Sequence, residues 1–171
     1  NKVCKKIDDN RDVLINIVKK IYDNPETGYK EEKTTGIVKN AFESLNLKPE
    51  ENIAVTGVKG SAGNNPSSIH LAVLGELDAL IWRDHPDADI ESGAVHACGH
   101  NNQIGIMLGV AFGLVKANIL NVLKGQIDFM AVPAEEFIEI EYRDDLIKEG
   151  QIHYMGGKQE LIKRGYFDEI D

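Results

Sequence analysis

The 171-residue chain has 28 acidic and 19 basic residues, which give it a formal net charge of -9 and a pI near 5.0. Hydrophobic residues make up 42% of it, an ordinary share for a folded domain with its own core. This acidity argues against nucleic acid or an anionic membrane as the partner, because both attract basic surfaces. The two cysteines, Cys4 and Cys98, are too few for a disulfide framework, so we expect a reducing, cytoplasmic location.

The first half of the chain predicts two helices followed by two strands. Residues 3–22 carry apolar side chains at mostly helical spacing, which predicts one amphipathic helix that ends at Asn24-Pro25. A second helix is expected over residues 30–45, a strand over 53–58 and a loop over 60–67. The run 69–74 is almost continuously apolar, which predicts a central strand buried on both faces.

The second half alternates between helix and strand. A surface loop over 82–93 leads to a helix that begins at Asn101 or Asn102 as its N-cap and runs to about residue 118. Three glycines, four residues apart, indicate that this helix lies close on a sheet. A turn at 123–125 and a strand over 126–132 follow, and Pro133 ends the strand. Residues 137–153 read as a loop with a short helix at 144–149, and a last helix over 158–164 has Gly165 as its C′ residue.

Strands separated by helices predict an α/β fold, a three-layer sandwich with a mainly parallel mixed sheet flanked by helices. In such folds functional side chains gather beyond the carboxyl ends of the strands. Residues 167–171 are expected to approach a further strand.

The segment His96-Ala97-Cys98-Gly99-His100 contains the best candidates for metal ligands. In extended backbone, residues two apart point to the same side, so the two histidines and Cys98 can face one point. Imidazole and thiolate are good ligands for zinc or manganese. The alternative is a small buried cysteine and two polar histidines in a turn.

Acidic side chains follow both of the later strands. Glu76 and Asp78 come after the strand at 69–74, and Glu135 and Glu136 after the strand at 126–132. Of two adjacent glutamates, one can bind a metal while its neighbour acts as a general base on water. The alternative is a pair of solvated acids in a loop.

Four motifs in this order resemble the M20 metallopeptidases, specifically their amidohydrolase branch of hippurate hydrolases, aminoacylases, auxin-conjugate hydrolases and aminobenzoyl-glutamate hydrolases. The motifs are Asn24-Pro25-Glu26, Gly75-Glu76-Leu77-Asp78-Ala79-Leu80, His96-Ala97-Cys98-Gly99-His100 and Pro133-Ala134-Glu135-Glu136. The resemblance extends over essentially the whole chain and implies a zinc-exopeptidase-like fold. It also implies hydrolysis of the amide bond of an N-acyl or N-aroyl amino acid or a small peptide.

The resemblance implies two divalent ions, zinc or manganese, in each complete site. By resemblance Cys98, His100 and Glu136 are metal ligands, and Glu135 is the general base that activates water and later protonates the leaving amine. By resemblance Asp78 is expected to orient a ligand, and His96 to support a ligand rather than bind metal itself. Glu76 stands where other branches place a histidine ligand, which leaves its role open.

The sequence departs from the family in ways that affect these expectations. Asn101-Asn102-Gln103 replaces the common Asp-x-His that follows Cys-Gly-His, which places the chain nearer the aminobenzoyl-glutamate-like members. Two further histidine ligands are expected beyond Asp171, together with a smaller domain that closes over substrate and forms a homodimer. Residues 1–171 are therefore expected to be a partial catalytic domain that binds metal weakly and has little activity alone. The alternative is a non-catalytic metal-binding or interaction domain on the same scaffold.

Overall fold

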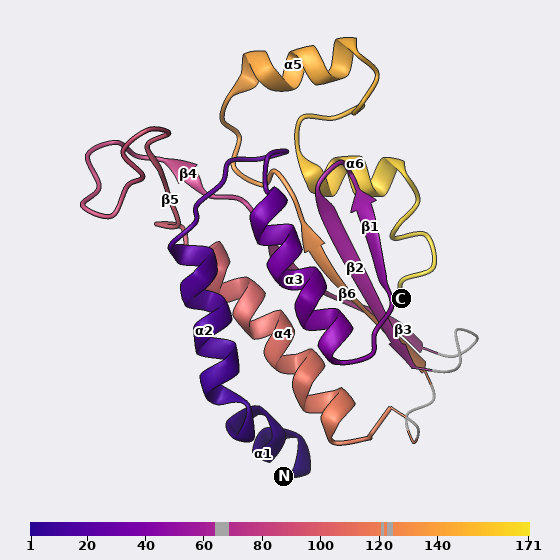
Figure 1. Ribbon diagram of the computed structural model, residues 1–171. Coiled ribbons are helices and arrows are strands. Elements are labelled where there is room, and N and C mark those ends of the chain that lie inside the picture. Colours follow the sequence, from indigo (N-terminus) through magenta and orange to yellow (C-terminus); the bar gives the residue numbers. More distant parts are fainter. Residues whose placement is uncertain (64–68, 121, 123–124) are drawn as a thin grey trace.

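The computed structural model describes residues 1–63, 69–120, 122 and 125–171, and a four-stranded sheet runs through it (Figure 1). The strands of this sheet lie in the order β1 (Pro49–Ile53), β2 (Gly57–Gly63), β6 (Gly125–Val132) and β3 (Ile69–Glu76). Two short strands, β4 (Leu80–Ile81) and β5 (Ala94–Val95), pair separately. The helices are α1 (Lys2–Asp9), α2 (Arg11–Tyr22), α3 (Glu32–Ser44), α4 (His100–Lys116), α5 (Ile140–Lys148) and α6 (Gly157–Lys163).

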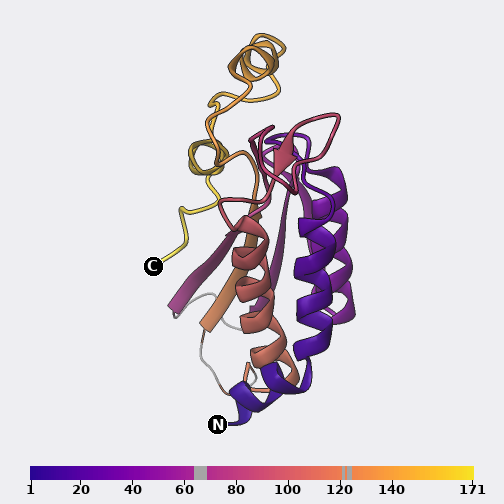
Figure 2. The same ribbon diagram turned by 90° about the vertical axis from the view of Figure 1, so that its left-hand side faces the viewer.

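The helices cover both faces of the sheet. Figure 2 shows α2, α3 and α4 on one side of the strands, with α6 and the C-terminal segment on the other. The main core fills the space between the sheet and the first group, and its largest buried side chains include Phe42, Ile104 and Phe129. A smaller cluster under α6 contains Met130 and Leu161. This arrangement confirms the expected α/β fold with a mixed sheet flanked by helices.

The strand directions differ in detail from the expectation. The described pairs β1–β2 and β2–β6 are antiparallel, and β3–β6 is parallel, so the sheet is mixed but not mainly parallel. β3 lies at the edge rather than the centre, and its Ile69, Leu71 and Leu74 are exposed. An apolar run therefore marked a strand correctly without showing how many neighbours the strand has.

The predicted strand over 53–58 is wrong, because the chain reverses direction there. β1 ends at Ile53, and Ala54 and Val55 adopt left-handed backbone angles in the turn to β2. A Cβ on Gly57 would lie 2.5 Å from the carbonyl oxygen of Ile53, so glycine permits the close return. β2 then continues to Gly63, through part of the predicted loop 60–67, while residues 64–68 and 123–124 lie outside the described part of the chain.

The predicted first helix is divided into α1 and α2 at Asn10. The side chain of Asn10 donates to the carbonyl oxygen of Lys6 at 2.7 Å and accepts from Lys116 Nζ at 2.8 Å. The side chain of Asn10 thus binds a carbonyl oxygen in the last turn of α1 and connects the break between α1 and α2 to the last residue of α4. Asparagine favours such local side-chain to backbone bonds, which compete with a continuous helix.

Helix α4 begins earlier than expected and packs differently. Its N-cap is Gly99, with φ of 89°, rather than Asn101 or Asn102. The glycines of α4 face α1 and α2 rather than the sheet: a Cβ on Gly105 would lie 2.3 Å from Val18, and one on Gly113 2.9 Å from Ile7. They allow close packing of these helices, while Ile104 on the opposite side of α4 reaches Gly75 in β3.

The later helices follow the predicted pattern with shifted bounds. α5 begins at Ile140, four residues before the expected helix, and α6 is followed by Gly165 with φ of 79°, as expected of a C′ glycine. At the C-terminus, Asp171 N–H donates to His70 O at 2.8 Å, so the last residue borders β3. In the part of the chain that the structure describes, no helix has both the length and the apolarity to cross a bilayer.

Candidate metal centre

The candidate residues meet at the carboxyl ends of β3 and β6, which are parallel neighbours, and at the first turn of α4. Leu77 N–H donates to Val132 O at 2.9 Å, which joins the chain just beyond β3 to the end of β6. The acids of both motifs therefore lie beside His100, although they are almost sixty residues apart in the sequence.

One group of possible ligands is Cys98, His100 and Glu136. A sulfur, nitrogen or oxygen atom from each lies within 4.8 Å of the other two. A second group, Glu76, His100 and Glu135, meets the same criterion. The three metal ligands expected within residues 1–171 thus lie close together, and His100 belongs to both groups.

The motif reaches this geometry by a turn rather than by extended backbone. Gly99 N–H points back to His96 O at 3.3 Å, and Gly99 leads directly into α4. His96 is consequently buried outside both ligand groups, and neither of its ring nitrogens has a partner among the described residues. Burial and the nearby His100 lower the pKa of His96 to about 4.

Asp78 fixes the orientation of His100. The Nδ1 atom of His100 lies 2.8 Å from the carbonyl oxygen of Asp78, which accepts hydrogen bonds only, so Nδ1 carries the proton and Nε2 faces the site. The Asp78 carboxylate adds a contact of 3.2 Å to Nδ1 and accepts the Glu136 N–H at 2.8 Å. A fully buried Asp78 thus holds two candidate ligands at once.

The carboxylates around His100 make it strongly basic. Burial lowers the pKa of the imidazole, but hydrogen bonds and charge from Asp78, with further charge from Glu76, raise it to about 9. Glu76 lies 3.0 Å from Nε2, whereas Glu135 and Glu136 lie at 3.8 and 3.9 Å. A metal ion and a proton would compete for the same nitrogen.

Cys98 is exposed and protonated in the absence of a cation. A hydrogen bond with Glu136, partial desolvation and the surrounding carboxylates raise the pKa of its thiol to about 11. The carboxylate atom Glu136 Oε1 is buried and has no hydrogen-bond partner among the described residues. An acceptor of this kind, beside a thiol and the Nε2 atom of His100, fits a divalent ion, which would also deprotonate the thiol.

Buried residues that the sequence analysis did not single out hold the loop after β6. Glu31, fully buried, accepts the Ala134 N–H at 2.8 Å and a hydrogen bond from Thr56 Oγ1. Burial raises the pKa of Glu31 to about 7. Buried Arg143 donates to the carbonyl oxygen of Glu136. No local pattern distinguishes Glu31 or Arg143, since both stand among other charged residues.

Glu26, from the first motif, forms hydrogen bonds to backbone groups and belongs to neither group of possible metal ligands. Its carboxylate accepts the N–H groups of Lys33 and Thr34 at the start of α3, and its carbonyl oxygen accepts the Ala79 N–H at 2.7 Å. The motif therefore links α3 to the segment that carries Asp78.

Lys158 is a further site residue that the sequence analysis did not identify. Its Nζ forms a hydrogen-bonded ion pair with Glu76 Oε1 and lies 3.9 Å from Glu135 Oε1. Gly157 explains how α6 brings the lysine so near: a Cβ at that position would lie 1.8 Å from Pro133 O. The glycine pair ahead of a helix was the signal available in the sequence.

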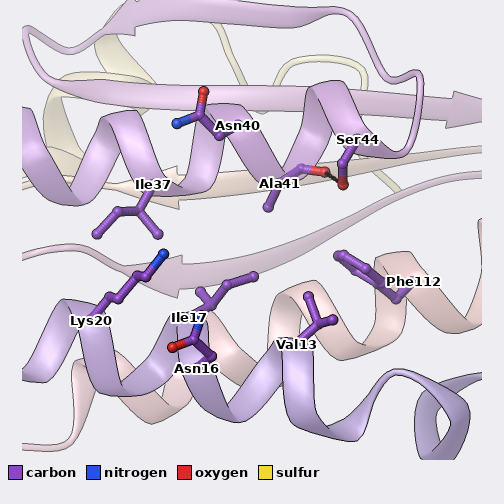
Figure 3. Close-up of a pocket in the computed structure, with 9 residues that line it drawn as sticks. All are labelled: Val13, Asn16, Ile17, Lys20, Ile37, Asn40, Ala41, Ser44 and Phe112. Atoms are coloured by element: carbon purple, nitrogen blue, oxygen red, sulfur yellow. Dashed lines mark hydrogen bonds between the residues drawn. The ribbon is translucent and has the colours of Figure 1, made fainter.

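A pocket elsewhere offers no comparable chemistry. Figure 3 shows side chains of α2, α3 and α4 around a hollow of about 270 Å³, including Ile17, Ile37 and Phe112. The only hydrogen bond drawn there joins Ser44 to the carbonyl oxygen of Ala41. Its lining contains no histidine, cysteine or acid, so the strand-end cluster remains the candidate site.

Comparison with known proteins finds relatives that are much longer than this chain. No protein-family model matches the chain. It is 31% identical to thermostable carboxypeptidase 2 of Saccharolobus solfataricus over 164 residues, 94% of this chain and 37% of that protein. It is also 31% identical to IAA-amino acid hydrolase ILR1-like 2 of Arabidopsis thaliana over 128 residues, 73% of this chain and 28% of that one. The chain thus spans well under half the length of these relatives.

A solved structure shares the fold. The Bacillus subtilis YXEP protein, described as a dinuclear metal binding peptidase from the M20 family, matches with a TM-score of 0.68 and 23% sequence identity. The match covers 92% of this chain and 40% of that one. The strand and helix arrangement described above therefore also occurs in that protein.

Proposed function

Because the chain belongs to the M20 family of peptidases and amidohydrolases, we propose that its strand-end cluster is part of a metal-dependent amide hydrolase site. The observation that carries the proposal is the convergence of Cys98, His100 and Glu136 within 4.8 Å, beside the carboxylate of Glu135. The proposed substrate is an N-acyl or N-aroyl amino acid or a small peptide, in keeping with the carboxypeptidase and amino acid hydrolase names of the relatives.

Cys98, His100 and Glu136 would hold a divalent ion, zinc or manganese, and the complete site would hold two. The unpartnered Glu136 Oε1 supports this assignment, because it is a ligand atom with no hydrogen bond that must be broken. His100 Nε2 faces the site, and an ion would replace the proton that it shares with Glu76. A bound divalent ion polarises a carbonyl group and lowers the pKa of water towards 7. Asp78 would keep both ligands in place through His100 Nδ1 and the Glu136 N–H.

Glu135 would act as the general base. Its side chain is 38% exposed, whereas that of Glu136 is 20% exposed, so Glu135 is the glutamate that water and substrate reach more easily. Its carboxylate would accept a proton from the attacking water and return it to the nitrogen of the leaving amine. The cleaved C–N bond would then yield a carboxylate and a protonated amine, which together hold the atoms of the amide and of the water.

Other properties of the whole protein remain proposals of the same kind. The match covers only 37% of the relative from Saccharolobus solfataricus, which suggests that further ligands and substrate contacts come from residues outside this chain. The resemblance to the family favours a homodimer. Cys4 and Cys98 are both free thiols, which suits a cytoplasmic location.

Alkylation of the two cysteines tests the metal site, because both thiols are exposed and Cys4 serves as an internal control. Zinc should slow modification of Cys98 at least about tenfold by occupying its sulfur, and should leave Cys4 unaffected. His100→Ala should remove the protection. Equal modification of Cys98 with and without zinc would contradict the proposed ligand set, whereas metal binding without hydrolysis of N-acyl amino acids by the whole protein would favour the non-catalytic alternative.

A further inference from the structure

Lys158 places a positive charge directly in the second ligand group. Its ammonium contacts Glu76 Oε1 and lies 3.9 Å from Glu135 Oε1, the two acids that would hold an ion there together with His100. Figure 1 shows the short helix α6, which carries Lys158, beside the upper ends of the strands. The Lys158 side chain is 44% exposed, while that of Glu76 is 9% exposed, so the lysine reaches inward from solvent to a nearly buried acid.

The two ligand groups compete for one atom. His100 uses Nδ1 to donate to the Asp78 carbonyl oxygen, so Nε2, 3.0 Å from Glu76, is its only nitrogen that can bind an ion in place of a proton. A single nitrogen lone pair binds one ion. An ion held by Cys98, His100 and Glu136 therefore leaves Glu76 and Glu135 without a nitrogen ligand, and an ion held by Glu76, His100 and Glu135 leaves Cys98 and Glu136 incomplete.

We propose that Lys158 directs the metal ion to the Cys98 group by occupying the Glu76 group with its own ammonium. The inference rests on the proposed function, and it adds that Lys158 determines which of the two ligand groups binds the metal ion. A divalent ion between Glu76 and Glu135 would face a like charge at contact distance or would have to break both lysine contacts. An ion at Cys98 and Glu136 leaves the lysine contacts intact.

This selection has a consequence for the kind of metal. The Cys98 group offers sulfur, nitrogen and oxygen, a set that favours zinc or cobalt, whereas the Glu76 group offers two carboxylates and one imidazole, which suit manganese or magnesium better. Lys158 would thereby favour the borderline ions over the harder ones. The competing explanation is a surface ion pair that has no effect on where the metal binds.

Cobalt(II) titration of the protein tests the inference, since a thiolate–cobalt bond gives a near-ultraviolet charge-transfer band that reports Cys98 ligation. We expect the unaltered protein to show this band, and Cys98→Ala to lose both the band and most of the affinity. Adding Lys158→Gln to Cys98→Ala should restore binding by about tenfold or more without the band, because the Glu76 group becomes available. Lys163→Gln, a change of the same kind on α6, is the matched control and should behave like the unaltered residue in either background.

Each result separates the inference from the proposed function. If the unaltered protein binds cobalt without the charge-transfer band, the assignment of Cys98 as a ligand is overturned. The double variant would still report whether Lys158 blocks the Glu76 group. If Cys98→Ala with Lys158→Gln binds cobalt no more tightly than Cys98→Ala alone, the role of Lys158 is overturned. An equal gain from Lys163→Gln would also overturn it, because the effect would then be one of overall charge.

Discussion

Glu31 Oε1 accepts a hydrogen bond of 2.8 Å from the backbone N–H of Ala134, the residue directly before the proposed general base. Ala134 has φ of 52°, a left-handed angle that costs an alanine energy, and its carbonyl oxygen accepts the Gly157 N–H at 3.1 Å. Two hydrogen bonds thus hold a strained residue between β6 and Glu135. Because Glu31 is fully buried, its charge is unfavourable despite this bond.

The titration of Glu31 should make the protein less stable as the pH rises from about 4.5 to 7. Below that range both folded and unfolded chains keep the proton, whereas within it only the folded chain does, because burial raises the folded pKa from 4.5 to about 7. The free energy of unfolding should fall by about 3 kcal/mol over the range from this residue. Glu31→Gln should remove this loss of stability, which urea unfolding at about pH 5 and about pH 8 would measure. Glu32→Gln, at an exposed neighbour, is the control. Parallel pH dependences of the Glu31 variant and the unaltered protein would contradict the expectation.

The adjacent glutamates should respond differently to the same substitution in the whole protein. Glu135→Gln should retain the metal and lose about 10²–10⁴-fold in kcat, because only proton transfer is removed. Glu136→Gln should lose metal content and activity together, since one of the proposed ligands is weakened. Metal analysis and steady-state kinetics of both variants check this. Loss of metal from Glu135→Gln but not from Glu136→Gln would show that the two roles are reversed.

Glu160 should stabilise the protein above about pH 4.5. It is buried, and burial alone would raise its pKa, but bonds from Arg164 and from the N–H groups of His153 and Tyr154 lower it to about 2. The unfolded chain therefore binds the proton first as the pH falls from 4.5, and the stabilisation of about 3 kcal/mol is lost by about pH 2. Glu160→Gln should lower the free energy of unfolding by this order at pH 7, with the difference disappearing in acid, whereas exposed Glu169→Gln should change little.

Gly157 should tolerate no side chain, in contrast to its neighbour Gly156. A Cβ at 157 would lie 1.8 Å from the backbone oxygen of Pro133, whereas one at 156 would meet the flexible end of Gln159. Gly157→Ala should therefore lower the free energy of unfolding by about 1–3 kcal/mol and shift Lys158 away from Glu76. Gly156→Ala should cost much less. Equal thermal stabilities of the two variants would show that α6 adjusts freely at the strand end.

The sequence predicted the candidate site best at residue types that have few roles in folded proteins. Glu76, Asp78 and the paired glutamates could be placed at strand ends because apolar runs precede them, and those runs became β3 and β6. Cys98 and His100 could be placed there because a helix was expected directly after them, and that helix became α4. Features set by distant neighbours could not be found in this way. Nothing local distinguishes Glu31 from Glu32, yet only Glu31 is enclosed by the turn at Thr56 and the loop at Ala134. The turn at Ala54 and Val55 was likewise missed, because Val55 favours strands and tertiary contacts override that preference.

The parallel pairing of β3 with β6 also governs when the site can form as the protein folds. The two strands are joined through α4, so their contact closes a long loop, and contacts of this kind form slowly. The ligand cluster does not exist until that contact is made, and an ion has nothing to bind in a chain that has only its helices. Added metal should therefore leave the refolding rate nearly unchanged and slow the unfolding rate, which makes the bound protein longer-lived rather than faster to fold.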